Sequence, residues 1–282
     1  MRHEASNFEP QKTWESAAPG WAKWEGVFSA GLAGATDVLI DMAGIQPGMR
    51  VLDLACGAGS QSIQVAKRVG SDGRVVASDI SATMLEHVRR NVLRAGLQNI
   101  ETLECAADDL DERQALFDAS ISRLGLMLFP SPQTALKAVR RVLRSSARFA
   151  ALVFTTPARN PFMAEPMSIL LRHAGKSPPA AGKPGIFALG SHGVLEELMK
   201  DCGLVDVKST TVQAPLRLAS ASDALEMLQQ AAGAYRAVVA ELGEVERSKA
   251  WREVHDSLKR FEAGGGFETE FDFIVVSGAN PS

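Results

Sequence analysis

Cysteines and long apolar runs are both scarce in this sequence of 282 residues. The three cysteines, Cys56, Cys105 and Cys202, lack the spacing of a metal-binding motif and cannot all pair with one another. This usage is typical of a reducing compartment, so we expect a cytoplasmic protein without a metal site. No apolar run approaches the roughly 20 residues of a membrane span, and the polar first residues do not resemble a signal peptide. We therefore expect no membrane span.

A surplus of positive charge is also absent. The net charge is −3, whereas a protein that binds the phosphates of nucleic acid is normally basic. The pairs Arg89-Arg90 and Arg140-Arg141 lie on amphipathic segments, where a solvated helix face accounts for them. The charge therefore argues against a nucleic-acid partner. With a hydrophobic content of 46%, the chain can bury one large core and an appended cap.

One dense motif stands out, Val51-Leu-Asp-Leu-Ala-Cys-Gly-Ala-Gly-Ser60. The residues before Gly57 are apolar except for Asp53, which predicts a buried parallel strand. Gly57 and Gly59 then make a turn too tight for side chains, and the residues from Ser60 onward are typical of a capped helix. The motif therefore predicts the first strand–turn–helix unit of a doubly wound sheet, where ligands bind at the carboxyl ends of the strands.

Acids also end the next two predicted strands. Residues 73–79 end in Asp79, which is placed to accept hydrogen bonds from ribose hydroxyls. Residues 100–110 end in Asp108, Asp109 and Leu110, and a carboxylate there could accept from an adenine amine. A pyrophosphate would meet Asp53 across a short, repulsive gap. The acids therefore favour a nucleoside that carries a sulfonium or an amine over a dinucleotide such as NAD.

These motifs carry a family resemblance. The segments 51–59, 77–85, 106–110 and 117–129 resemble successive motifs of the class I, seven-strand methyltransferases that depend on S-adenosylmethionine. The chain is similar to their small-molecule type, near the ubiquinone/menaquinone C-methyltransferase group. The resemblance covers residues 47–157 well and extends to residues 271–279, which resemble the last strand. It implies an α/β fold with a doubly wound, mostly parallel, seven-stranded sheet, and S-adenosylmethionine as the cofactor.

The sequence departs from that family at one turn and divides into three regions. Where relatives usually carry a Pro-Gly-Gly turn before the fifth strand, this chain has Arg144-Ser-Ser-Ala-Arg148. We expect an N-terminal helical cap over residues 1–46, a Rossmann-like core over 47–157, and a variable cap with the last strands over 158–282. Within the third region, residues 220–262 predict a long helical insertion. This insertion and the N-terminal helices are expected to roof the strand ends, with a mobile loop near residues 178–185.

The strand-end acids and the matched motifs together predict the contacts of the cofactor. They are Asp53, Ala55, Gly57, Gly59, Asp79, Ile80, Met84, Asp108, Asp109, Leu110 and Arg123. Because a sulfonium already activates its methyl group, transfer is an in-line displacement. Such a reaction gains most from holding the reacting atoms aligned and about 3–3.5 Å apart.

Candidate catalytic residues are few, because a base is needed only when the acceptor keeps its proton near neutral pH. Arg123 follows the fourth predicted strand, where it either organises the carboxylate end of the cofactor or anchors the acceptor. His173 is the histidine best placed to act as a base, with a structural role as the competing interpretation. Tyr235, the only tyrosine, could reach a polar group of the substrate.

The acceptor is expected to be a small, largely apolar molecule that is uncharged or weakly acidic. Candidate contacts are Trp21, Trp24, Phe28 and Tyr235, although aromatic residues at helical spacing more often pack against their own domain. Two other classes stay open: a cofactor-binding protein that has lost transfer, and a nicotinamide-dependent oxidoreductase. The latter is disfavoured because the turn lacks the third glycine of the dinucleotide fingerprint. Helical caps often supply dimer contacts, so a homodimer also stays open.

Overall fold

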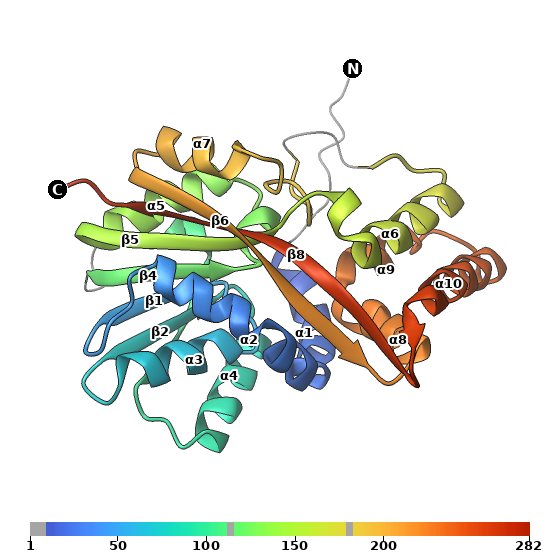
Figure 1. Cartoon of the computed structure of the whole chain (residues 1–282), viewed down its shortest axis with the longest axis horizontal. Coiled ribbons are helices and arrows are strands. Elements are labelled where there is room, and N and C mark those ends of the chain that lie inside the picture. Colours follow the sequence, from blue (N-terminus) through green and yellow to red (C-terminus); the bar gives the residue numbers. More distant parts are fainter. Residues whose placement is uncertain (1–9, 112–115, 179–182) are drawn as a thin grey trace.

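A twisted, mostly parallel β-sheet organises the protein, for which the computed structural model describes residues 10–111, 116–178 and 183–282 (Figure 1). The strand order is β3-β2-β1-β4-β5-β8-β6, with the two-residue strand β7 paired to β8. The first five strands in this order are parallel, and β8 is antiparallel to both of its neighbours. The strands are β1 (Arg50–Leu54), β2 (Arg74–Asp79), β3 (Ile100–Glu104), β4 (Phe117–Arg123), β5 (Leu143–Phe154), β6 (Val205–Leu218), β7 (Glu262–Ala263) and β8 (Gly266–Ala279).

Helices cover both faces of this sheet. From the centre, the strand order runs outward in two directions, β1 to β3 on one side and β4 to β5 on the other. Since crossovers between parallel strands are right-handed, the two directions place their helices on opposite faces. The helices are α2 (Glu25–Met42), α3 (Ser60–Val69) and α4 (Ala82–Arg94) on one side, and α5 (Pro132–Val142) and α7 (Val194–Asp201) on the other. The expected doubly wound fold is confirmed.

The central strands are apolar because both of their faces are covered. In β1, Val51, Leu52 and Leu54 are buried, and the stretch of β5 from Phe149 to Phe154 is buried throughout. Such continuous runs are the pattern expected of parallel strands packed between helix layers. The polar exception in β1, Asp53, is therefore held inside the protein rather than at its surface.

The departure at residues 144–148 is absorbed by β5. Phe117 pairs with Leu143 and Ala119 with Arg148, so the residues between them bulge out of the ladder. Ser146 takes a positive φ of 64° at this point. The chain thus makes the left-handed turn for which glycine is the usual residue, and the sheet continues beyond it undisturbed.

The cap stands on a ribbon formed by β6 and β8. The ladder between β5 and β8 ends at Phe154 and Phe273, whereas β6 and β8 stay paired as far as Leu218 and Phe267. The ribbon therefore projects beyond the carboxyl edge of the sheet, as Figure 1 shows. Near it lie the helices of the cap, of which α8 contacts β6 and the others pack on one another: α1 (Pro10–Lys23), α6 (Pro161–His173), α8 (Ala221–Ala231), α9 (Gly233–Val238) and α10 (Glu244–Leu258).

The helical insertion that the sequence predicts over residues 220–262 is divided into three helices. It folds as α8, α9 and α10, because its parts cover different partners: α8 packs on α1, whereas α10 packs on α6. One straight helix could not reach both. The loop expected to be mobile near residues 178–185 falls partly on residues 179–182, which lie outside the described part of the chain.

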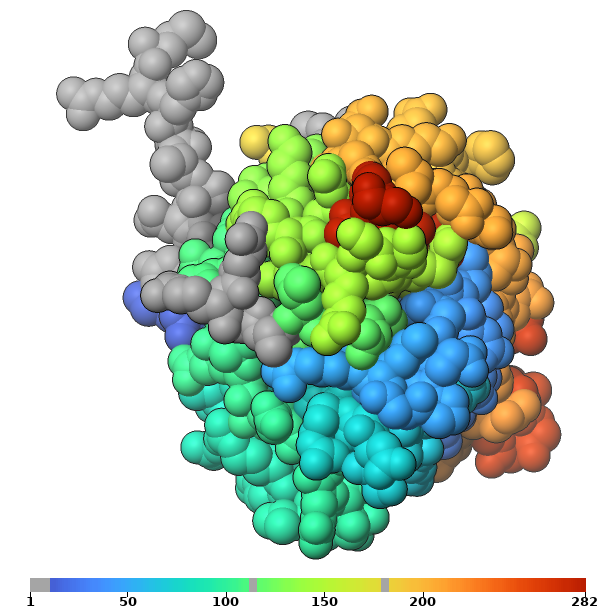
Figure 2. Space-filling view, turned by 90° about the vertical axis from the view of Figure 1, so that its left-hand side faces the viewer, coloured from blue at the N-terminus to red at the C-terminus, as the bar shows by residue number. Residues whose placement is uncertain are grey.

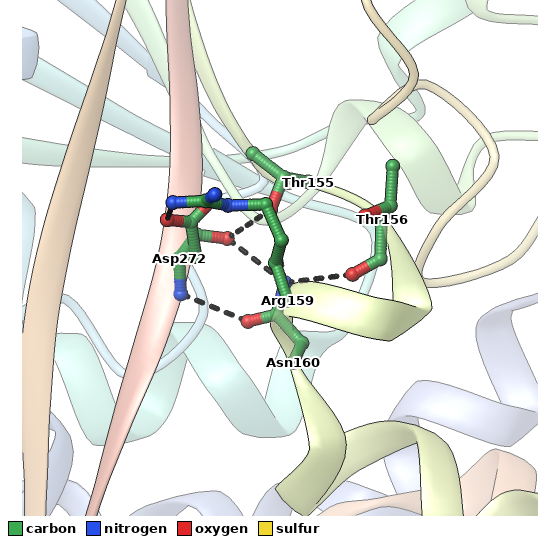
Figure 3. A network of polar contacts seen from close by, with 5 residues as sticks. All are labelled: Thr155, Thr156, Arg159, Asn160 and Asp272. Atoms are coloured by element: carbon green, nitrogen blue, oxygen red, sulfur yellow. Dashed lines mark hydrogen bonds and ion pairs between the residues drawn. The ribbon is translucent and has the colours of Figure 1, made fainter.

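A buried polar network fixes the point where β5 ends and the cap begins (Figure 3). The Asn160 side chain lies between two strand ends: its Oδ1 accepts from the backbone N–H of Asp272 at 2.9 Å, and its Nδ2 lies 3.1 Å from Thr155 Oγ1. Thr155 Oγ1 donates to Asp272 Oδ1 at 2.5 Å, and Arg159 Nη2 pairs with Asp272 Oδ2 at 2.7 Å. Burial raises the pKa of Asp272, but the hydrogen bonds from Arg159 and Thr155 outweigh it and leave that pKa low. The network therefore ties the start of α6 to β8.

We expect Asn160→Ala to lower the free energy of unfolding by about 2–4 kcal/mol, because it leaves more than one buried polar group without a partner. Urea unfolding monitored by circular dichroism measures this loss. Asn280→Ala is the matched control, since Asn280 is half-buried and donates to the Leu143 carbonyl at 3.0 Å. That variant should lose no more than about 1 kcal/mol. Equal losses in the two variants would contradict the proposed role of the network.

Candidate functional site

A cavity of about 270 Å³ opens at the carboxyl ends of the parallel strands. It lies where the strand order turns outward between β1 and β4, which is the position at which open α/β sheets bind their ligands. Its floor is formed by the residues that follow four strands: 54–58 after β1, 79–80 after β2, 105–108 after β3, and 123–125 with 128–130 after β4. Its other walls come from helices and consist of Trp14, Trp21, Glu25, Ser60, Gln61 and Met84.

The glycine turn after β1 forms part of the floor. Gly57 and Gly59 have φ values of 56° and 92°, in the left-handed region that favours glycine. A Cβ built on Gly57 would meet no atom within 4 Å, so the space above it belongs to the cavity. A Cβ on Gly59 would approach Val88 at 3.0 Å, so that residue lets α3 pack on α4 and does not line the cavity.

Asp79 lines the cavity at the end of β2. Its Oδ2 accepts from the backbone N–H of Gly57 at 2.9 Å, and its Oδ1 accepts from that of Ser81 at 3.0 Å. Burial raises the pKa of this carboxyl, and the backbone hydrogen bonds oppose the shift. Because a carboxylate has about four acceptor positions, Asp79 keeps capacity for ligand hydroxyls while it holds the glycine turn. Its neighbours Ile80 and Met84 also line the cavity, as does Ala55.

Asp53 lies behind the floor rather than in it. Its side chain is fully buried, and it accepts hydrogen bonds from Ser62 Oγ and, at 3.3 Å, from Gln61 Nε2. Desolvation raises the pKa of Asp53 to about 6, in spite of these bonds and of the nearby positive charge of Arg123. The residue therefore holds the first turn of α3 in place. Gln61, which donates a hydrogen bond to Asp53, lines the cavity and lies between the carboxylate and the space above the floor.

At the end of β3, only one of the two predicted acids reaches the cavity. Asp108 lines it, whereas Asp109 and Leu110 do not. The two aspartates are consecutive in a short 3₁₀ turn, so their side chains leave the backbone in different directions, and Leu110 is buried in the core. The structure therefore brings Asp108 alone of these three predicted cofactor contacts to the cavity, because the sequence does not reveal which way this turn faces.

Arg123 ends β4 and lines the cavity from beneath. Its Nη1 donates to Thr36 Oγ1 at 2.9 Å, and its Nη2 donates to Ser60 Oγ at 2.6 Å. Burial lowers the pKa of Arg123, while the charges of Glu25 and Asp53 raise it, and the guanidinium stays charged. Glu25 also lines the cavity and escaped notice in the sequence, because an acid in the first turn of a helix is ordinary there.

A second turn, after β4, completes the floor and was not singled out from the sequence. Leu124 has a positive φ of 63°, and a Cβ on Gly125 would lie only 2.6 Å from the Cβ of Ala55. The turns after β1 and β4 therefore touch, and only a glycine fits between them. Beyond this contact, Leu128 and Phe129 add apolar surface to the cavity. The single glycine in Arg123-Leu-Gly-Leu was the available signal.

The N-terminal tryptophans divide between the cavity and the cap. Trp14 and Trp21 line the cavity, and the ring of Trp21 stacks on Phe28 with centroids 4.6 Å apart. Phe28 therefore supports the wall from behind. Trp24 faces away, because its Nε1 donates to Gln230 Oε1 of α8 at 3.0 Å. The expectation that Trp24 contacts the acceptor was wrong, since that side chain joins the turn between α1 and α2 to the insertion instead.

Two further candidates lie away from the cavity. The Tyr235 side chain is buried in the cap, where its hydroxyl donates to the Met163 carbonyl at 2.7 Å. Burial raises the pKa of this phenol, so it does not serve as an acid or a base. His173 Nε2 lies 2.9 Å from Glu253 Oε2 and joins α6 to α10. Both residues therefore stabilise the cap, which corrects their assignment as catalytic or substrate candidates.

The thiols in the cavity are not poised to react. Cys56 and Cys105 line it, and burial raises the pKa of each thiol, with nearby carboxylates adding to the shift. A nucleophilic thiolate is therefore not available near neutral pH. Across the described residues, no cluster of three or more metal-ligating side chains occurs. No helix in the same residues is long and apolar enough to cross a membrane.

A larger, open groove of about 780 Å³ lies at the opposite, amino edge of the sheet. Figure 2 shows the molecule from that side, with the C-terminal residues in red. Basic side chains of α5 and of the residues that follow it line the groove, but two of them already have partners. Arg140 donates to the Cys202 carbonyl, and Arg144 pairs with Asp118. Because ligands of this fold class bind at the carboxyl edge, we assign the site to the smaller cavity.

Known proteins resemble this chain in sequence and in fold. The chain is 36% identical to the ubiquinone/menaquinone biosynthesis C-methyltransferase UbiE of Cellvibrio japonicus over 119 residues, which are 42% of this chain and 48% of that protein. It is 34% identical to the 2-phytyl-1,4-naphtoquinone methyltransferase of a Nostoc species over 127 residues, 45% of this chain and 56% of that protein. The matches thus span about half the length of these relatives.

A solved structure shows the same fold over nearly the whole chain. Phosphoethanolamine N-methyltransferase 2 of Haemonchus contortus matches 98% of this chain and 61% of its own, with a TM-score of 0.60 and 14% identity. The model of the ubiE/COQ5 methyltransferase family matches residues 17–173, a range that includes the glycine turn, Asp79 and Arg123. This match extends over more than half of the chain, and the protein belongs to the ubiE/COQ5 methyltransferase family.

Proposed function

We propose that this protein transfers a methyl group from S-adenosylmethionine to a small, largely apolar acceptor. The observation that carries the proposal is the convergence of Gly57, Asp79, Asp108 and Arg123 on one cavity at the carboxyl edge of the sheet. The family supports the same reaction, since the relatives described above are named as methyltransferases.

The residues present fit this cofactor. The open space above Gly57 admits a close approach that any Cβ would block. Asp79 and Asp108 are acceptors suited to ribose hydroxyls and to an adenine amine, and Met84 with Ile80 offers apolar contact to a base. When bound, S-adenosylmethionine would supply a methyl group already activated by its sulfonium. The protein then has only to hold the reactants in line and to exclude water.

The acceptor would meet an aromatic wall rather than a protein base. Trp14, Trp21, Leu128 and Phe129 provide apolar surface beside the floor of the cavity, which suits a flat or largely apolar molecule. Neither a histidine nor a tyrosine of the described chain lines the cavity. The acceptor is therefore proposed to be a nucleophile already, or weakly acidic, so that positioning accounts for the rate.

The cap supports this wall from outside. Residues of the insertion do not line the cavity in the described part of the chain, but α8 packs against α1. Lys23 of α1 pairs with Glu226, and Trp24, between α1 and α2, donates to Gln230, so both contacts join the N-terminal helices to α8. The insertion is thus proposed to hold the roof formed by the N-terminal helices. This keeps the transfer site enclosed, as expected for a small-molecule acceptor.

Binding of S-adenosylmethionine compared with NADH tests the proposal directly. Calorimetry should detect the first and not the second, and product formation with a panel of apolar phenols or enols should follow. A protein that binds the cofactor and methylates none of a broad panel would instead fit the catalytically silent alternative. Tighter binding of NADH would contradict the proposal.

Asp79→Ala should weaken S-adenosylmethionine binding by about 10- to 150-fold, the effect of losing a charge-assisted hydrogen bond. The structure offers a matched control at the next strand end. Asp109→Ala removes the same charge from a residue that does not line the cavity, and it should leave the dissociation constant unchanged. Calorimetry on variants with native circular dichroism decides the point, and equal effects in both would remove Asp79 from the site.

Gly57→Val should abolish cofactor binding in a folded protein, since its side chain would fill the floor of the cavity. The left-handed backbone adds a cost of about 1–2 kcal/mol to stability. Gly70→Val separates the two effects, because Gly70 has φ 72° and open space around it but does not line the cavity. The control should lose similar stability and bind normally. Normal binding by Gly57→Val would show that the turn is not the cofactor seat.

Asp53 should make the binding of the sulfonium depend on pH. With its pKa raised to about 6, Asp53 is largely neutral below that pH and ionised above it, and the ionised form attracts a cation. S-Adenosylhomocysteine, whose sulfur is an uncharged thioether, serves as the reference ligand. The ratio of the affinity for S-adenosylmethionine to that for S-adenosylhomocysteine should therefore rise about fivefold or more as the pH rises through 6. Asp53→Asn should flatten this ratio. A persistent slope in that variant would assign the titration to another group.

A further inference from the structure

Two opposite charges line the cavity beside the same serine, Ser60. Glu25 is the first residue of α2, in the N-terminal cap, whereas Arg123 is the last residue of β4, in the core. Both line the cavity. Among the ion pairs of the described residues, none joins these two side chains, so their charged groups are more than 4 Å apart. The two charges therefore interact electrostatically but do not form a direct ion pair.

Each charge is held in place by neighbours that leave it hydrogen-bonding capacity. Arg123 donates one hydrogen bond to Thr36 and one to Ser60, which leaves other N–H groups of its five free. Burial raises the pKa of Glu25, and the charge of Arg123 and a hydrogen bond from Ser60 counteract it. The position of Glu25 at the start of a helix further favours its ionised form. The Ser60 hydroxyl thus links the Glu25 carboxylate and the Arg123 guanidinium.

The other acidic residues of the cavity are suited to binding the nucleoside part of the cofactor. Asp79 and Asp108 follow β2 and β3, on the side proposed for ribose and adenine. The pair Glu25 and Arg123 lies instead beside Ser60, the first residue of α3, on the other side of the glycine turn. A ligand that carries an ammonium and a carboxylate on one carbon would satisfy both members of such a pair. Neither a neutral ligand nor a simple anion would.

Resting on the proposed function, we propose that Glu25 and Arg123 together hold the zwitterionic amino-acid end of the cofactor. Glu25 accepts hydrogen bonds from the α-ammonium, and Arg123 donates to the α-carboxylate. Because Glu25 belongs to the cap and Arg123 to the core, the amino-acid end bridges the two. Glu25 is therefore a specificity residue that selects nucleosides with an intact amino acid over those that lack it.

Calorimetry with two probes tests this role. S-Adenosylhomocysteine carries the amino acid, whereas 5′-methylthioadenosine has the same nucleoside and thioether without it. Glu25→Gln should weaken S-adenosylhomocysteine on the order of 10- to 100-fold and leave methylthioadenosine within about twofold. Asp37→Asn is the matched control, because it makes the same change at an exposed position of the same helix. That variant should bind both probes as the unchanged protein does.

A third probe separates the ammonium from the rest of the amino acid. The 2-oxo analogue of S-adenosylhomocysteine replaces the ammonium-bearing carbon with a carbonyl, so Glu25→Gln should bind it as well as the unchanged protein does. Equal loss of all three probes would overturn the proposal, because Glu25 would then only support the shape of the cavity. Unchanged binding of S-adenosylhomocysteine with lower turnover would also overturn it and make Glu25 a base. If the unchanged protein binds neither nucleoside, the proposed function itself fails.

Discussion

The burial of the Arg123 guanidinium is the constraint around which the site is organised. A buried charge costs several kcal/mol unless it is both paired and hydrogen-bonded. Its hydrogen-bond partners, Thr36 and Ser60, come from α2 and α3, and the acids that balance it, Glu25 and Asp53, come from α2 and β1. Satisfying one side chain therefore fixes two helices and two strands against each other. The cavity forms where these elements meet.

Much of the floor could be predicted because its causes are local. A strand, two glycines and a helix start follow one another within residues 50–60, and the glycines take the backbone conformation that only they adopt easily. Parallel topology then carries the ends of β1, β2 and β3 to one edge, so Asp79 and Asp108 arrive at the same cavity. The sheet itself follows from the alternation of strands and helices.

The walls could not be predicted in the same way, because they depend on how distant segments meet. Trp21 and Trp24 have similar surroundings in the sequence, yet one faces the cavity and the other reaches α8. Tyr235 and His173 are chemically able candidates, but the packing of the cap places both in structural contacts. Asp109 differs from Asp108 only by one step along a short turn. For Trp24, Tyr235 and His173, the direction of the side chain is decided by a partner far away along the chain.

The separation of floor and walls has a consequence for how proteins of this fold can diversify. The floor of the cavity is built by residues 54–58 and the neighbouring strand ends, whereas the aromatic wall belongs to α1 and is supported by α8. These two helices contact each other directly, and the ribbon of β6 and β8 carries the insertion beyond the sheet. Substitutions at the interface of α1 and α8 can therefore reshape the aromatic wall while the strand-end floor keeps its geometry. Selection for a new ligand would act first on the cap, and the strand-end residues would stay fixed.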